Sequence, residues 1–217
     1  MKLKLYTYWR SSAAYRVRIA LNLKGLPHEL TPVHLLREGG EHLTEDFARL
    51  NPQRLVPVLI DGERVLRQSM AIIEYLDEAY PDIPLMPSEL RSRHRVRALA
   101  QLVACDIHPV ANLRVMKYLE GEYGLGAEQK AAWQRRWIQE GFDALEQLLA
   151  DCPTTGEFCE GDDPTLADAC LAPQVYNAIR FECPLRPYPT IRRIYANCMA
   201  VEAFHDASPD RQPDAKS

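Results

Sequence analysis

Two adjacent serines near the N-terminus have a type and a position that could do chemistry. Ser11 and Ser12 follow a strand-like stretch, Leu3 to Tyr8, and precede an apolar pattern that predicts a helix over residues 12–24. The first turn of a helix offers unpaired N–H groups and the positive end of the dipole, which lower the pKa of a nearby thiol. A hydroxyl there can also donate a hydrogen bond to a thiolate. The alternative is a simple N-cap, and the two roles are compatible.

A third serine begins a later helix. Gln68 and Ser69 precede an apolar pattern that predicts a helix from Ser69 to about Tyr80, with Ser69 as its N-cap. The N-terminus of a helix is a natural site for an anion such as a carboxylate. A plain cap is again the alternative.

Three arginines are candidates for binding carboxylates. Arg10 stands at the end of the first strand, Arg114 on a long helix, and Arg180 at the end of a helix predicted over Thr165 to Arg180. A planar guanidinium binds a carboxylate through two hydrogen bonds and keeps its charge, which suits a dicarboxylic acid. A solvated surface side chain is the alternative for each of them.

His108 and Asn112 are spaced to share a helix face, since they are four residues apart. Pro109 between them is expected to kink the helix and open backbone groups. His108 is therefore a candidate general acid or base, although a lone helical histidine is more often structural.

The elements that carry these residues indicate two domains. The first ~80 residues alternate in the order βαβαββα, which is an α/β arrangement. Pro81, Pro84 and Pro87 break any helix and mark a linker. Beyond it, helical patterns follow at about 89–120, 128–151, 165–180 and after Pro189, and the last ten residues read as a loose tail. We expect domains over residues 1–84 and 89–212.

Composition restricts the partners. The chain has 217 residues, 47% of them hydrophobic, and a formal net charge of −4 without a long basic block, which argues against a nucleic-acid partner. It has no apolar run of about 18 residues and no signal-like N-terminus, so we expect neither membrane insertion nor export. The six cysteines lack metal-ligand spacing and predict free thiols in a reducing cytoplasm, with no bound metal. A small molecule is the expected partner.

Two further patterns are read as structure. Thr165 and Asp168 have the spacing of a capping box at the start of a helix. Alternate arginines from Arg91 to Arg97 would repel one another unless acids lie opposite, and Glu74, Asp77 and Glu78 are available, which favours a homodimer interface over a solvated face.

The segment from Tyr8 to Leu21 resembles the signature of the zeta-class glutathione transferases, the family of maleylacetoacetate and maleylpyruvate isomerases. Its motif reads Ser-Ser-Cys-x-x-Arg-Val-Arg-Ile-Ala-Leu. The resemblance covers nearly the whole chain, through Leu23-Lys24-Gly25, Leu50-Asn51-Pro52-Gln53, Val56-Pro57, Gln68-Ser69, Ala71 to Leu76, Gly161-Asp162, Pro164 to Asp168 and Pro187-Tyr188-Pro189. It implies a thioredoxin-like N-terminal domain followed by an all-helical C-terminal domain, and a homodimer in the cytoplasm that serves aromatic amino acid catabolism.

The resemblance also assigns roles. It implies glutathione as the cofactor, with Ser11, Ser12 and Arg10 catalytic and Arg10, Arg114 and Arg180 around the substrate. The residues expected to bind glutathione are Ser11, His42, Gln53, Val56, Gln68, Ser69, His108 and Asn112. A cis peptide bond before Pro57 would turn the Val56 backbone outward, where it could pair with the cysteinyl backbone of a peptide ligand.

The activity that the resemblance implies is cis–trans isomerisation of a dicarboxylic oxo-acid, maleylacetoacetate or maleylpyruvate. Glutathione thiolate adds to the cis double bond, the resulting single bond rotates, and expulsion of the thiolate leaves the trans, fumaryl isomer. Ala13 stands where the motif usually has cysteine, so the sulfur has to come from glutathione. The alternatives are a general glutathione transferase or peroxidase acting on varied electrophiles, and a binding scaffold without catalysis.

Overall fold

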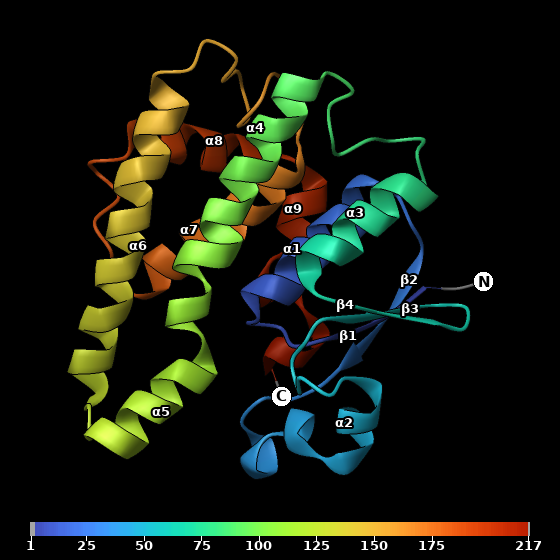
Figure 1. Cartoon of the computed structure of the whole chain (residues 1–217), viewed down its shortest axis with the longest axis vertical. Helices are drawn as coiled ribbons and strands as arrows, with labels where there is room; N and C mark the ends of the chain where they lie inside the picture. Colours follow the sequence, from blue (N-terminus) through green and yellow to red (C-terminus); the bar gives the residue numbers. More distant parts are fainter. Residues whose placement is uncertain (1–2, 217) are drawn as a thin grey trace. The chain divides into compact units, whose positions relative to one another are not determined.

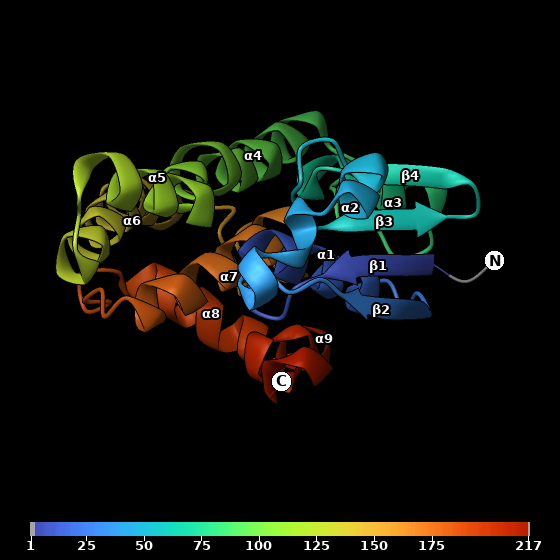
Figure 2. The same ribbon diagram turned by 90° about the horizontal axis from the view of Figure 1, so that it is seen from below.

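The computed structural model describes residues 3–216, and its first unit is built on a four-stranded sheet. The strands β1 (Leu3–Thr7), β2 (His28–Pro32), β3 (Val58–Asp61) and β4 (Arg64–Arg67) lie in the order β2-β1-β3-β4, which can be followed in Figure 2. β1 is parallel to β2, whereas β3 is antiparallel to both β1 and β4. This topology confirms the predicted thioredoxin-like arrangement.

The two faces of the sheet are covered by different helices. Figure 1 shows α1 (Ser12–Leu23) and α3 (Ser69–Ala79) on one face and the short α2 (Glu45–Leu50) on the other. Side chains alternate along a strand, so Leu5 is fully buried under α1 and α3 while Tyr6 meets Phe47 of α2, with ring centroids 6.4 Å apart. Packing of α1 on the sheet therefore positions the start of this helix and the Ser11 residue that precedes it.

The C-terminal segment also belongs to the first unit. This unit comprises the residues up to Leu85 together with the segment from Val201, whose helix α9 (Glu202–Ala207) packs on α1. Tyr15 Oη donates to the Phe204 carbonyl at 3.2 Å, and Asn22 Nδ2 donates to the Ala203 carbonyl at 3.1 Å. We expected the second domain to cover residues 89–212. In the structure the helical unit covers Met86–Ala200, and the residues after Ala200 belong to the first unit.

The expectation of a loose tail over the last ten residues is wrong for the part of it that the structure describes. Residues 208–216 contain two 3₁₀ turns, Pro209–Arg211 and Pro213–Lys216. Gln212 and Asp214 are 5% and 7% exposed, because their side chains have hydrogen-bond partners in the first unit. Ser217 lies outside the described residues.

The second unit is all helical, as predicted. It contains α4 (Leu90–Gln101), α5 (Leu113–Tyr123), α6 (Ala127–Ala150), α7 (Leu166–Arg180) and α8 (Pro189–Ala200). α7 is buried along most of its length and packs against α4 and α8, the latter visible in Figure 2. Within residues 3–216, no helix combines the length and the apolar character needed to cross a membrane. All six cysteines are free thiols.

The capping box at the start of α7 is confirmed. The Thr165 N–H donates to Asp168 Oδ2 at 2.8 Å, and the Cys159 N–H donates to Asp168 Oδ1 at 2.8 Å. Asp168 is fully buried, and burial raises the pKa of its carboxyl, while these donors act in the opposite direction. The residue anchors a loop and a helix end, which is a structural role.

The single helix predicted over 89–120 is broken. α4 ends at Gln101, a π-helical turn covers Leu102–Ile107, a 3₁₀ turn covers Pro109–Ala111, and α5 begins after Asn112. Pro109 has no N–H to continue the helical ladder, and the Asn112 side chain caps the new helix instead.

Two residues of the expected interface, Arg95 of α4 and Asp77 of α3, form ion pairs within their own units. Arg95 pairs with Glu160 and donates to Thr155 Oγ1 at 2.7 Å, whereas Asp77 pairs with Lys24 at 3.1 Å. Arg95 and Asp77 therefore give no support to the expected interface, and the homodimer stays a prediction.

Candidate active site

Ser11 is the N-cap of α1. Its φ of −73° and ψ of 115° lie outside the helical region, and its Oγ accepts the Ala14 N–H at 3.3 Å. Because this bond uses a lone pair of Oγ, the hydroxyl hydrogen stays available to donate to a ligand. Ser12 is buried as the first residue of the helix, and Ala13 follows it half-buried. The capping role is therefore confirmed, and it leaves the thiolate role possible.

Arg10 lies in the turn that leads into α1. The turn is closed by the Ser11 N–H, which donates to the Tyr8 carbonyl at 3.0 Å. The Arg10 guanidinium carbon lies 5.1 Å from the centroid of the Trp9 ring, a cation–π contact that orients the side chain. A permanent positive charge is thus placed next in sequence to the Ser11 hydroxyl.

The start of α3 differs from the prediction in one residue. Gln68 is the N-cap, with a positive φ of 69°, and Ser69 is the first helical residue, so the expectation that Ser69 caps the helix is wrong. The exposed Gln68 side chain donates through Nε2 to Gln53 Oε1 at 2.8 Å. Two of the residues expected to bind glutathione are therefore in direct contact.

A cation that the sequence analysis left unassigned stands behind Ser69. Arg16 is 2% exposed, and its Nη1 lies 3.4 Å from Ser69 Oγ, within donating distance. α3 has no acidic residue in its first turn. Its N-terminal N–H groups and the nearby guanidinium together favour an anion at this helix end. No pattern near Arg16 in the sequence indicates this contact, because Ser69 is 53 positions away along the chain.

The peptide bond between Val56 and Pro57 is cis, as predicted. β3 begins only at Val58, and among residues 3–216 no group forms a hydrogen bond with the Val56 backbone. An unpaired N–H and C=O at a strand end can pair with an extended peptide, as in strand addition. Val56 therefore fits the backbone of a peptide ligand.

His42 is nearly buried in the 3₁₀ turn Glu41–Leu43. The imidazole lies against Gly40, where an added Cβ would be 2.5 Å from its Cε1 atom. Gly40 also has a φ of 118°, a region that other residues rarely adopt. The lack of a side chain at Gly40 thus leaves the space that the His42 imidazole occupies.

The remaining candidates lie in the second unit. His108 precedes the 3₁₀ turn and Asn112 is the N-cap of α5, so the expectation that they share a helix face is wrong. Asn112 Oδ1 accepts the Arg114 backbone N–H at 3.2 Å, and Arg114 is exposed on the first turn of α5. Arg180 ends α7, exposed and 4.6 Å from the Phe181 ring centroid.

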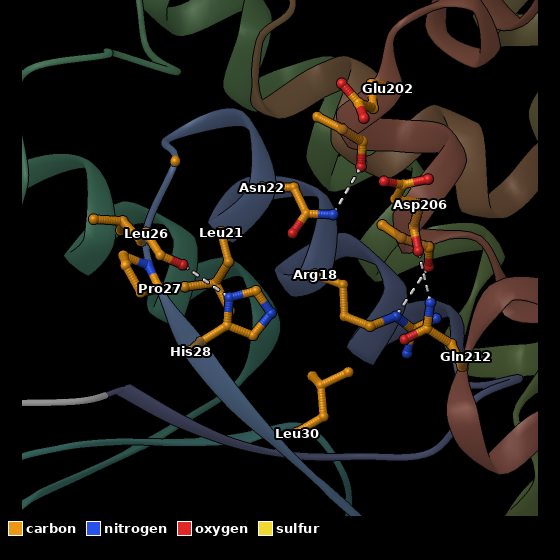
Figure 3. Close-up of a pocket in the computed structure, with 13 residues that line it drawn as sticks. Arg18, Leu21, Asn22, Leu26, Pro27, His28, Leu30, Glu202, Asp206 and Gln212 are labelled. Carbon is orange, nitrogen blue, oxygen red and sulfur yellow. Dashed lines mark hydrogen bonds between the residues drawn. The ribbon is translucent and has the colours of Figure 1, made fainter.

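A cavity of about 580 Å³ lies elsewhere in the first unit, beside α1 and the C-terminal segment (Figure 3). Its lining includes Arg18, Asn22, His28, Asp206 and Gln212. None of the predicted site residues lines it.

The first unit therefore offers two helix N-termini without acidic residues and one unpaired strand end. α1 can stabilise a thiolate beside Ser11, α3 can bind a carboxylate beside Ser69, and the Val56 backbone can pair with a peptide. A peptide that carries both a thiol and a carboxylate fits this combination. The fold and the site define a glutathione-binding protein of the transferase type.

Comparison with known proteins agrees with this class. The family model described as "Glutathione S-transferase, N-terminal domain" matches residues 10–79. A Vibrio cholerae protein named "Probable maleylacetoacetate isomerase" is 54% identical over 99% of both chains. A "Maleylpyruvate isomerase" from Ralstonia is 51% identical over 98% of this chain and 100% of that protein.

Solved structures give the same result. A holo structure of maleyl pyruvate isomerase, described as a bacterial zeta-class glutathione S-transferase, has a TM-score of 0.95 and 51% identity, covering 98% of this chain and 99% of that one. A maleylacetoacetate isomerase from Methylobacterium extorquens with bound malonate and glutathione has a TM-score of 0.95 and 42% identity, covering 99% of this chain and 100% of that one. This chain belongs to the zeta-class glutathione S-transferase family.

Proposed function

We propose that this protein is a glutathione-dependent cis–trans isomerase that converts maleylacetoacetate or maleylpyruvate to the fumaryl isomer. The observation that carries the proposal is the similarity over the full chain to proteins named as isomerases of these two acids, at 54% and 51% identity. The N-termini of α1 and α3, which suit a thiolate and a carboxylate, support glutathione as the cofactor.

Residues of the first unit would hold glutathione. Ser69 and the first turn of α3 bind its γ-glutamyl carboxylate, with Gln68 and Gln53 beside them, and the Val56 backbone pairs with its cysteinyl backbone. When bound, glutathione supplies a thiolate that can add reversibly to an activated double bond. The Ser11 hydroxyl donates a hydrogen bond to that sulfur, and the N–H groups of α1 stabilise the negative charge of the thiolate.

The first unit contains no cysteine that could replace that sulfur. Ala13 occupies the position where the family motif has cysteine, and all six cysteines, Cys105 to Cys198, lie in the second unit. The absence of a cysteine from α1 supports an absolute requirement for glutathione.

The arginines account for the choice of a dicarboxylic substrate. Arg10, Arg114 and Arg180 keep their charge and can hold carboxylates, and they can stabilise negative charge on an oxygen as it develops. His42, His108, Asn112 and Ser12 complete the proposed site, His108 as a candidate general acid or base. Family resemblance alone supports three finer proposals, namely a homodimer, a cytoplasmic location and a role in aromatic amino acid catabolism.

A substrate comparison tests the proposal. We expect purified protein with glutathione to isomerise at least one of the two maleyl acids, and to conjugate an uncharged electrophile such as 1-chloro-2,4-dinitrobenzene far more slowly. Efficient conjugation without isomerisation would identify a general transferase instead. Glutathione binding without either reaction would identify a scaffold.

A further inference from the structure

Arg18 is a buried cation whose hydrogen bonds reach the turn in front of the active-site helix. The residue is 1% exposed. Nη1 donates to Thr7 Oγ1 at 2.9 Å and to the Tyr8 carbonyl at 3.3 Å, and Nη2 donates to the Trp9 carbonyl at 3.0 Å. Nε donates to the Ala207 carbonyl at 3.0 Å. One side chain therefore joins the end of β1, the following turn and the C-terminal segment.

Helix geometry explains this reach. Arg18 is seven residues, about two turns, after Ser11 and so lies on the same side of α1. Side chains on a helix point back toward its N-terminus, which directs the long arginine side chain to the carbonyls before the first turn. Figure 3 shows Arg18 extending from α1 toward Gln212 of the C-terminal segment.

Asp214 completes the attachment from the other side. Its Oδ2 accepts the Trp9 N–H at 2.9 Å, and the residue is 7% exposed. Burial lowers the pKa of Arg18 to about 10, and the negative charge of Asp214 opposes that effect, so Arg18 is protonated at neutral pH.

The C-terminal segment that supplies Asp214 is itself braced. Gln212 Nε2 donates to the carbonyls of Asp206 and Ser208, each at 2.9 Å, and these bonds hold the chain between α9 and Asp214. The C-terminal segment is therefore ordered by its own hydrogen bonds where it contacts the turn from Tyr8 to Ser11.

Three backbone groups of the turn just before Arg10 and Ser11 are thus held by hydrogen bonds. The Tyr8 carbonyl accepts from both Ser11 N–H and Arg18, while the Trp9 N–H and carbonyl bind Asp214 and Arg18. Arg10 and Ser11 are the next two residues along the chain. A small displacement of a catalytic group can lower the reaction rate by a large factor, so a rigid turn before Ser11 would favour catalysis.

We propose that Arg18 and Asp214 are positioning residues, through which the C-terminal segment fixes the turn from Tyr8 to Ser11 and so sets the Ser11 hydroxyl against the sulfur of bound glutathione. The catalytic consequence rests on the proposed function. The structural part of the proposal, that Asp214 holds this turn in place, is independent of the proposed function.

The test compares Asp214→Ala, Asp214→Asn and the control Asp206→Asn, which makes the same change on an exposed carboxylate of the same segment. Asp214→Ala should speed amide hydrogen exchange in a peptide spanning residues 7–15 by about tenfold, because Trp9 loses its acceptor. Asp214→Asn keeps an acceptor oxygen and should restore most of the protection. The control should exchange like wild type.

Readouts on the full-length protein separate positioning from general stability. For Asp214→Ala we expect a higher midpoint in the ultraviolet titration of the bound glutathione thiol and turnover lowered by about threefold or more, with the glutathione Kd changed less than twofold. The proposal would be overturned if residues 7–15 of Asp214→Ala exchanged at the same rate as in wild type. It would also be overturned if Asp214→Ala had a lower Tm but an unchanged titration midpoint. If wild-type protein does not isomerise, the proposed function fails, and the exchange and titration data still decide the positioning role.

Discussion

Gln68 and Gln53 meet at the start of α3, where Gln68 Nε2 donates to Gln53 Oε1 at 2.8 Å although fifteen residues separate them. Both side chains are exposed, so the pair is held by this bond and by the unusual backbone of Gln68, whose φ is 69°. Their amide groups present further donors and acceptors to a ligand bound at the first turn of α3. The pair therefore marks the carboxylate end of the proposed glutathione site.

Replacing Ser69 tests that end of the site. Ser69→Ala removes a hydroxyl beside the α3 N-terminus, and glutathione binding measured by calorimetry should weaken by about 1–3 kcal/mol, the range for a charge-assisted hydrogen bond. Gln68→Ala should weaken binding in the same direction. Ser88→Ala, an exposed serine in the linker, is the matched control and should leave the affinity unchanged. Equal affinities for all four proteins would remove α3 from the binding site.

Substrate charge should determine the effect of losing an arginine. Arg114→Met or Arg180→Met should lower turnover of a maleyl acid by tenfold or more, which is about 1.4 kcal/mol, because each removes a carboxylate partner. Conjugation of an uncharged electrophile should change little. Arg136→Met, at an arginine of α6 whose side chain is 71% exposed, serves as the control. Losses that are equal for charged and uncharged substrates would indicate misfolding and would contradict the assigned role.

The buried carboxylate of the α7 capping box should matter for stability. Asp168→Ala leaves the N–H groups of Cys159 and Thr165 and the Thr165 hydroxyl without their buried acceptor. The free energy of unfolding, measured with urea, should fall by about 3 kcal/mol or more, since each unsatisfied buried group is costly. Asp163→Ala removes an exposed carboxylate from the same loop and should have little effect. A small loss for Asp168→Ala would show that these donors find other partners.

Thiol reactivity should separate the cysteines by burial. Cys159 and Cys198 are buried, and burial raises the pKa of both thiols, so neither should react with a disulfide reagent in the folded protein. Thr154 Oγ1 lies 3.3 Å from the Cys152 sulfur, and hydrogen bonds from Thr154 lower the pKa of that thiol.

The pH profile gives the sign of that effect. A lower pKa means that the Cys152 thiolate forms at lower pH, so its rate of labelling should rise at lower pH in wild type than in Thr154→Val. Mass spectrometry of the labelled peptide gives the rate for this cysteine alone. Identical profiles for the two proteins would contradict the role of Thr154.

Features determined by neighbours in the sequence were predictable. Ser11 capping α1 and the Thr165–Asp168 box follow from residues within four positions of each other, and the βαβαββα order of elements along the first unit follows from the apolar patterns. Family resemblance supplied the cis bond before Pro57, which local composition alone would not.

Features that depend on distant contacts were not predictable in the same way. Asp214 binds Trp9 across 205 residues of sequence, so a polar, proline-rich terminus read locally as a loose tail. Gln68 adopts a positive φ that glutamine rarely takes, and no local sequence pattern indicates it. The π-helical turn at Leu102–Ile107 likewise has no distinct local pattern, which is why His108 and Asn112 were assigned to one helix face.

The central claim is that the sulfur used in isomerisation comes from glutathione held at the N-terminus of α1. The most direct measurement compares isomerisation of a maleyl acid with no thiol, with glutathione, and with S-methylglutathione, whose sulfur cannot form a thiolate. We expect turnover only with glutathione, inhibition of that turnover by S-methylglutathione, and a slower rate in Ser11→Ala with glutathione still bound. Isomerisation by the purified protein in the absence of any thiol would contradict the account.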